Sequence, residues 1–203
     1  MPSASTRSAL NPKRLRRSCR LTSANTANTA NSTNGRRKTT TLIHLITGGT
    51  GAGKTTYARA LADEIGGVRY SIDDWMTALF WMDAPEPPDF DWVMERIARV
   101  EAQMWANTLQ MIALKTPVIF DLGFTTTDHR AKFIDLAKGV NITPNLHWID
   151  IDAEERWRRV QSRNTSRGET FAMDVPRDMF DFMEDRWEAP TDHDAIVITR
   201  VTK

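Results

Sequence analysis

Gly48-Gly49-Thr50-Gly51-Ala52-Gly53-Lys54-Thr55 matches the pattern G-x-x-x-x-G-K-[ST], which is the P-loop or Walker A motif. An apolar run over residues 42–46 precedes it. The residues that follow it show helical periodicity, with apolar side chains at i, i+3, i+4 and i+7: Ala58, Leu61, Ala62 and Ile65. The motif therefore stands between a predicted strand and a predicted helix. This context predicts a binding site for a nucleoside triphosphate.

The residue types of this stretch suit phosphate binding. Glycines let the backbone curl so that successive N–H groups point at one phosphate, and the positive N-terminus of the next helix adds to that field. Lys54 can reach the β- and γ-phosphates, and the Thr55 hydroxyl can bind Mg²⁺. The predicted nucleotide-binding residues are consecutive: Gly48, Gly49, Thr50, Gly51, Ala52, Gly53, Lys54, Thr55 and Thr56.

Charge is distributed unevenly along the 203 residues. Residues 1–40 hold nine of the 27 Lys and Arg residues and no acid, so the remaining 163 residues carry a formal charge of −8. The first 40 residues are rich in Ser, Thr and Asn and have almost nothing apolar to bury, which predicts disorder. We therefore expect a disordered basic tail over 1–40 and one folded domain over 41–203.

The basic tail has alternative interpretations. We favour a solvated extension or an upstream start of translation, and an organellar transit peptide is the minority interpretation. The tail could also contact nucleic acid without specificity, although the acidic remainder does not favour a duplex-binding surface. No apolar run approaches the length of a membrane span, and the only cysteine, Cys19, cannot form an intrachain disulfide. These features favour a cytoplasmic protein.

Predicted strands and helices alternate along the domain. The apolar and turn patterns predict strands at 41–47, 68–72, 118–121, 146–151 and 195–198. They predict helices at 54–65, around Trp75 and Leu79, at 89–114, at 127–138, after an Asp152 cap, and at 176–187. This alternation predicts an α/β fold with a mainly parallel sheet and helices on both faces. Ligands in such sheets bind at the carboxyl ends of the strands.

Three acids follow predicted strands at that edge. Asp73 and Asp74 come directly after the second strand, and Asp121 ends the third. A carboxylate after the second strand could accept the proton of a substrate hydroxyl, so we assign Asp73 to catalysis and Asp74 to capping the next helix. Asp121 has the position of a Walker B acid, which holds Mg²⁺ directly or through water, with a loop cap as the alternative. The predicted metal-binding residues are Thr55 and Asp121.

Arginines after the third and fourth strands complete the predicted site. Arg156, Arg159 and Arg163 share one face of a helix that leads into a polar stretch at 164–175, which suits a mobile lid. We expect Arg159 and Arg163, before Arg156, to cover the phosphates. Arg130 could neutralise the transferred phosphate or hold an anionic substrate, although surface exposure explains it nearly as well.

Four stretches resemble small P-loop kinases grouped with the zeta toxins, chloramphenicol phosphotransferase and the kinase domain of polynucleotide kinases. They are residues 48–56, residues 71–75, residues 118–124 with Arg130, and residues 159–164. The resemblance implies a P-loop kinase domain with a three-layer fold, sheet order 2-3-1-4-5 and an Arg-bearing lid. It implies ATP with Mg²⁺, Asp73 as the base, and residues 187–191 near the adenine, where Ala189 replaces a proline of the family pattern.

Three functions are compatible with these residues. The leading hypothesis is a kinase that transfers the γ-phosphoryl group of ATP to a hydroxyl of a small molecule. The second is a polynucleotide or RNA-end kinase, which the basic tail favours and the acidic domain does not. The third is a nucleotide-binding regulatory module with weak ATP hydrolysis. The sequence does not identify the acceptor or the oligomeric state.

Overall fold

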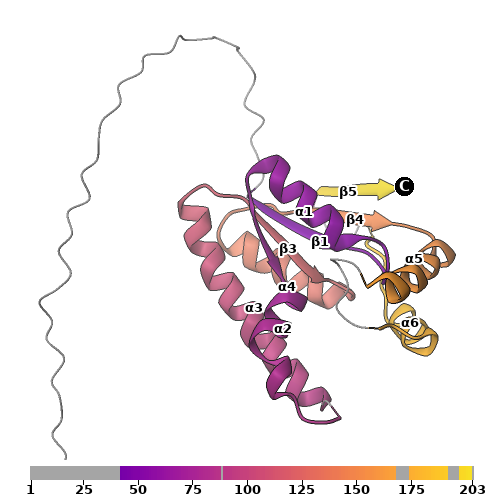
Figure 1. Ribbon diagram of the computed structural model, residues 1–203. Coiled ribbons are helices and arrows are strands. Elements are labelled where there is room, and N and C mark those ends of the chain that lie inside the picture. The colour runs from indigo at the N-terminus through magenta and orange to yellow at the C-terminus, as the bar shows by residue number, and fades with distance from the viewer. Residues whose placement is uncertain (1–41, 88, 168–173, 192–196, 203) are drawn as a thin grey trace, which may run out of the picture. The chain divides into compact units, whose positions relative to one another are not determined.

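The computed structural model describes residues 42–87, 89–167, 174–191 and 197–202 (Figure 1). The expected disordered tail over 1–40 lies outside the described residues. All strand pairs are parallel, and the five strands are ordered β2-β3-β1-β4-β5, which confirms the predicted fold class. The strands are β1 (Ile43–Thr47), β2 (Val68–Ser71), β3 (Val118–Gly123), β4 (Asn145–Asp150) and β5 (Val197–Thr202).

Helices cover both faces of this sheet. They are α1 (Lys54–Ile65), α2 (Ile72–Leu79), the short 3₁₀ helix η1 (Trp81–Asp83), α3 (Phe90–Ala113), α4 (Thr127–Gly139), α5 (Ala153–Ser166) and α6 (Arg177–Glu184). Alternate residues of β1 point to opposite faces, as the period of a strand requires. Ile43 and Leu45 pack in the core formed with α2, α3 and α4, whereas Ile46 packs in the core beneath α1. The three-layer arrangement follows.

The first turns of α2 and α5 are each stabilised by the side chain of an N-cap residue. The N-cap of α2 is Ser71, whose hydroxyl accepts from the backbone N–H of Asp74 at 3.2 Å. The prediction that Asp74 caps this helix is therefore wrong, and both Asp73 and Asp74 lie in its first turn, where they stabilise the positive end of the helix. Asp152 caps α5 as expected, accepting from the N–H groups of Glu154 and Glu155.

Tertiary pairing moves two element boundaries away from their predicted positions. β5 was expected at 195–198, but it continues to Thr202 because its whole length is paired with β4, from Asn145↔Val197 to Asp150↔Thr202. β3 extends two residues beyond Asp121 because Gly123 pairs with Thr47 of β1. In both strands the hydrogen-bonded partner, rather than the length of the apolar run, sets the end.

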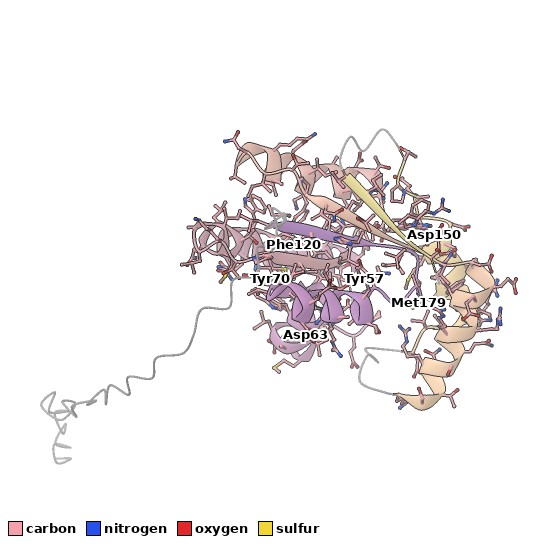
Figure 2. The ribbon with its side chains drawn as sticks, turned by 90° about the horizontal axis from the view of Figure 1, so that it is seen from above. Tyr57, Asp63, Tyr70, Phe120, Asp150 and Met179 are labelled. Atoms are coloured by element: carbon pink, nitrogen blue, oxygen red, sulfur yellow. The ribbon has the colours of Figure 1, made fainter. Side chains whose placement is uncertain are left out.

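α5 and α6 pack together at one end of the sheet, away from α2 and α3 (Figure 1). Val160, Phe180 and Val175 are buried between them. In Figure 2 the labelled Asp150, at the end of β4, and Met179, on α6, lie on the same side of the molecule. Asn164 holds the chain that joins the two helices, because its side-chain amide bonds both the N–H and the C=O of Val175. Asn164 and Val175, the two ends of the stretch expected to form a lid, are therefore in contact. Residues 168–173 of that stretch lie outside the described part.

Among the described residues, no helix combines the length and the apolar character that crossing a membrane would require.

Candidate active site

The P-loop connects β1 to α1 and wraps around the start of that helix. Gly51 and Gly53 have φ angles of 79° and 94°, in the left-handed region that side chains disfavour. A Cβ at Gly51 would also stand 2.6 Å from the carbonyl oxygen of Arg156. The Lys54 ammonium folds back over the loop and donates to the carbonyls of Gly48 (2.8 Å) and Gly49 (3.0 Å). The loop therefore has the closed curvature that presents backbone N–H groups to phosphate.

Arg156 supports this loop from behind. Its guanidinium forms a two-point ion pair with Glu184 of α6, and it donates to the carbonyls of Thr50 (3.3 Å) and Ile151 (2.9 Å). The residue is only 5% exposed. We expected Arg156 to be the last of the three arginines to matter, yet it is the one in contact with the P-loop. Its bonds are to protein groups, so its role here is to fix the loop to α5 and α6.

Asp73, the predicted base, and Asp121, the predicted metal ligand, lie within electrostatic range of Lys54 and of each other. Lys54 interacts with both Asp121 and Asp73, and these attractions oppose the effect of burial, which lowers the pKa of its ammonium. Partial desolvation by neighbouring residues raises the pKa of the Asp73 carboxyl, and the charge of Asp121 raises it further, although Asp73 keeps substantial contact with water. A carboxylate with a raised pKa is a stronger proton acceptor than an ordinary aspartate.

Asp121 has a cationic partner that the sequence did not reveal. Arg69 of β2 donates from Nε (3.1 Å) and Nη2 (2.8 Å) to one oxygen of Asp121, and from Nη1 to Asp74 at 2.9 Å. Asp121 is 6% exposed, so this is a nearly buried ion pair. Asp121 was expected as a metal ligand, and the Arg69 pair leaves only its other oxygen for that role.

A magnesium ion fits the donors of the site if nucleotide supplies part of the shell. The described residues contain no group of three or more His, Cys, Asp or Glu side chains placed to hold a metal ion. Mg²⁺ commonly takes one or two carboxylates and completes its octahedron with phosphate oxygens and water. Thr55 in the first turn of α1, together with the oxygen of Asp121 that Arg69 does not contact, matches that requirement.

The two predicted lid arginines differ in position. Arg163 interacts electrostatically with Asp73 and Lys54, and its Nε is buried without a hydrogen-bond partner in the described structure. Such a donor costs free energy unless a ligand satisfies it. Arg159 is instead paired with Glu155 on its own helix at 2.9 Å. The structure therefore brings Arg163, and not Arg159, to the predicted catalytic groups.

Arg130 does not lie where the sequence led us to expect. It is fully buried. Its guanidinium donates to the carbonyls of Phe124 (3.3 Å) and Glu188 (2.8 Å) and to the Thr127 hydroxyl (3.1 Å). A guanidinium surrounded by protein acceptors is not presented to a phosphate. Arg130 instead fixes the chain at residues 188–189 against the start of α4, which corrects the expectation that it binds phosphate or an anionic substrate.

A cavity of about 890 Å³ opens at the P-loop. The loop contributes Gly48, Gly49, Thr50 and Lys54 to its lining, α3 contributes Phe90 and Met94, and α4 contributes His129. Its other walls come from residues 125–126, from α6 and from residues 185–188. The volume is within the range of small-molecule sites.

A family model described as an AAA domain (AAA_33) matches residues 43–190, which is most of the chain and almost all of the described fold. The chain belongs to this AAA domain family. The matched region begins with β1 and includes the P-loop, Asp73, Asp121 and Arg163. No curated relative matches at a significant level. The family fixes the P-loop NTPase class, and the narrower group of zeta toxins and chloramphenicol phosphotransferase has no separate support.

Solved structures share the fold of this AAA domain at low identity. A protein titled as a candidate kinase from Chloroflexus aurantiacus is 16% identical, with a TM-score of 0.61 over 80% of this chain and 88% of that one. Kti12 from Chaetomium thermophilum, solved with ADP-AlF3, is 18% identical, with a TM-score of 0.59 over 79% and 88%. A chain of the Pnkp1/Rnl/Hen1 RNA repair complex is 20% identical, with a TM-score of 0.55 over 75% and 46%. These likenesses show a kinase-like P-loop fold.

Residues whose partners lie far away in sequence were the ones missed in this AAA domain. Arg69 and Glu184 carry no local signal, because their partners Asp121 and Arg156 are 52 and 28 residues away. A buried chain of hydrogen bonds also escaped notice: His147 bonds His44 at 2.9 Å and Tyr57 at 2.8 Å. We expected the two histidines to be packed in the core, and they are, but as a polar cluster beside α1.

Proposed function

We propose that this protein is an ATP-dependent kinase that transfers the γ-phosphoryl group to a hydroxyl of a small molecule, with Mg²⁺. The observation that carries the proposal is that Lys54, Asp73 and Arg163 lie close enough beside the P-loop to interact electrostatically. Phosphoryl transfer needs positioned cations around the phosphate and an acceptor for one proton. These three side chains supply both, and the kinase-like fold of the family is consistent with this use.

Each residue has a distinct task in the proposed reaction. Asp73 takes the proton of the acceptor hydroxyl as its oxygen forms a bond to the γ-phosphorus, and the bond from that phosphorus to the β,γ-bridging oxygen breaks to release ADP. Lys54 and Arg163 neutralise charge on the phosphoryl oxygens. The consecutive P-loop residues Gly48 to Thr56 hold the β-phosphate. Thr55, with Asp121, would hold Mg²⁺, which would supply further charge neutralisation.

The test compares Asp73→Asn with Asp74→Asn. Asp74 is the matched control because it lies in the same helical turn but pairs with Arg69 at the surface. A screen of hydroxyl compounds for stimulated ADP release first identifies an acceptor. We expect Asp73→Asn to bind ATP normally and to lose phosphorylation at least about 100-fold, within the range for general-base catalysis. Undiminished phosphorylation in Asp73→Asn would contradict the assignment of the base.

Two other functions make different predictions in the same assays. A polynucleotide or RNA-end kinase is suggested by the basic tail and by the RNA repair complex among the fold relatives. This function requires that the protein phosphorylates an oligonucleotide with a free 5′-hydroxyl. It also requires that the affinity for the oligonucleotide falls steeply as the salt concentration rises. A regulatory module requires slow hydrolysis that no hydroxyl compound stimulates. The acidic charge of residues 41–203 favours the small-molecule kinase over a polynucleotide or RNA-end kinase.

A further inference from the structure

Two helices place unusually exposed apolar side chains around the 890 Å³ cavity. Phe90 and Met94 stand four residues apart on one face of α3 and are 73% and 45% exposed. Phe182 of α6 is 55% exposed, and Met183 and Trp187 line the cavity beside it. Isolated exposed apolar residues are common on proteins, but three exposed and two half-buried apolar side chains that line one cavity mark a ligand site.

The position of this cavity on the P-loop indicates which ligand it receives. Lys54, which reaches the β- and γ-phosphates in P-loop proteins, lines the cavity together with Gly48, Gly49 and Thr50. Of the described residues, Thr55 and Thr56 at the other end of the loop are not in its lining. The cavity thus opens on the side of the loop where the γ-phosphate is expected, which is where a phosphoryl acceptor has to lie.

One polar side chain of the lining is shared with a neighbouring cavity and is held by a buried acid. His129 lines the large cavity and also a second one of about 370 Å³, with Met94 common to both. Its Nε2 lies 2.8 Å from Oε1 of Glu101, and Glu101 is 4% exposed. Lys132 donates to the other oxygen of Glu101 at 2.7 Å. Since Nε2 lies beside Glu101, Nδ1 is the ring nitrogen of His129 that is left for a ligand in the cavity.

The charges of the lining disfavour a nucleic-acid strand as the ligand. Asp185 and Glu188 line the cavity, and its only cations among the described residues are Lys54 and Arg186. Arg186 lies flat on Phe182, 3.5 Å from the ring centroid, so it extends the apolar wall. A nucleic-acid strand needs a row of cations, which this lining does not provide.

We propose that this cavity is the acceptor site, and that the acceptor is an alcohol with an aromatic or aliphatic body whose hydroxyl is hydrogen-bonded by His129. The apolar body lies between Phe90 and Met94 of α3 and Phe182 of α6. Lys54 lines the same cavity, so the bound hydroxyl shares it with the residue expected to contact the γ-phosphate. The inference rests on the proposed function, and it narrows the acceptor to an amphipathic small molecule, as opposed to a sugar or a nucleic-acid end.

The experiment uses naphthylethanol, an aromatic primary alcohol, as the probe, and glycerol as the polar comparison. Binding is measured by calorimetry on the full chain saturated with a non-hydrolysable ATP analogue. We expect naphthylethanol to bind and glycerol not to. Phe90→Ser and Phe182→Ser should each weaken probe binding by about tenfold, as expected for losing part of an aromatic contact. Met82→Ser is the control, because Met82 is 80% exposed and outside the lining.

His129 is tested by two substitutions. His129→Phe keeps the ring packing on Phe124 and should weaken the probe severalfold without changing ATP affinity. His129→Asn retains a hydrogen-bonding group and should recover part of the loss. A purely structural role would lower stability and ATP affinity in both variants together, and that result would overturn the assignment.

Further outcomes separate this inference from the proposed function. If the ATP analogue abolishes probe binding, the cavity is the site of the adenine ring, and the inference is overturned. So would a dimer of the wild-type chain that Phe90→Ser dissociates, because the apolar walls would then be an interface. Phosphorylation of a sugar that Phe90→Ser and Phe182→Ser leave unchanged would overturn the inference and leave the kinase intact. Binding of the probe as predicted, with no phosphate transferred to any alcohol, would instead count against the kinase.

Discussion

Arg156 fills the space that a side chain at Gly49 would need. A Cβ at Gly49 would stand 2.2 Å from Nη1 of Arg156, and that guanidinium is held in place by Glu184. The P-loop glycine is therefore required by a packed arginine as well as by the approach of phosphate. This contact links the loop to α5 and α6, two elements that follow it by more than 100 residues.

Gly49→Ala should destabilise the protein by about 1–3 kcal/mol, the usual cost of overpacking a site that cannot relax. Gly139→Ala is the control, because nothing lies within 4 Å of a Cβ at that position. The control should be neutral or stabilising by about 0.4–1 kcal/mol. Urea unfolding of the two variants measures the difference, and equal stabilities would show that Arg156 moves aside freely.

Removing the carboxylate that holds Arg156 should be costly. Glu184→Leu leaves a buried guanidinium without its partner, and we expect a loss of about 2–3 kcal/mol, below the range for fully buried pairs because Glu184 is 23% exposed. Asp181→Asn on the same helix breaks the exposed pair with Arg177 and should change stability by less than about 0.5 kcal/mol. Thermal unfolding distinguishes the two, and similar melting temperatures would contradict a supporting role for the Arg156–Glu184 pair.

His147 should make the protein sensitive to mild acid. Burial, aided by the nearby His44, lowers the pKa of His147 from 6.5 to about 4. Between about pH 4 and 6.5 the His147 side chain therefore binds a proton in the unfolded chain but not in the folded chain. The free energy of unfolding should fall as the pH drops from 6.5 to 4 and level off below that. The loss amounts to roughly 3 kcal/mol. Unfolding free energies at several pH values test it, and His147→Gln should lack this part of the pH dependence.

Arg163→Ala and Arg159→Ala should separate the two arginines of α5. Arg163 acts on Asp73 and Lys54, so its loss should lower phosphoryl transfer by at least about tenfold, a modest share of what an arginine at a transferring phosphate contributes. Arg159 is paired with Glu155 and should tolerate alanine with less than about a twofold change, as expected for a partly exposed helical pair. The readout is ADP release with a saturating acceptor. A larger effect at Arg159 would reverse the assignment.

Arg130→Lys tests the structural role of that arginine. Lysine cannot reproduce the several directions in which the guanidinium donates, so we expect a loss of roughly 1–3 kcal/mol in unfolding free energy with ATP affinity unchanged. Arg200→Lys at the exposed edge strand is the control and should be nearly neutral. Weakened ATP binding with unchanged stability would restore the phosphate contact first expected from the sequence.

Local patterns were sufficient to predict the sheet, and distant pairings were not. The P-loop, the apolar runs and the alternation of strand with helix predicted a mainly parallel sheet, because each signal is contained in a few consecutive residues, whereas the order β2-β3-β1-β4-β5 was implied by the resemblance to small P-loop kinases. Asp73 was proposed as the base because an acid directly after a strand is also a local signal, and that role stays a prediction. The roles of Arg130 and Arg156 were misjudged because their acceptors, at residues 188 and 184, depend on how the chain returns in three dimensions.

The central place of β1 has a consequence for synthesis. Among the described residues β1 is the first strand to be synthesised, yet its two neighbours are β3 and β4, which end at residues 123 and 150. One edge of β1 therefore has no native partner until β3 has been made, and the other has none until β4 has been made. Exposed edges of this kind invite pairing with other chains, so a nascent form of this protein would depend on chaperones or on rapid elongation to reach its fold.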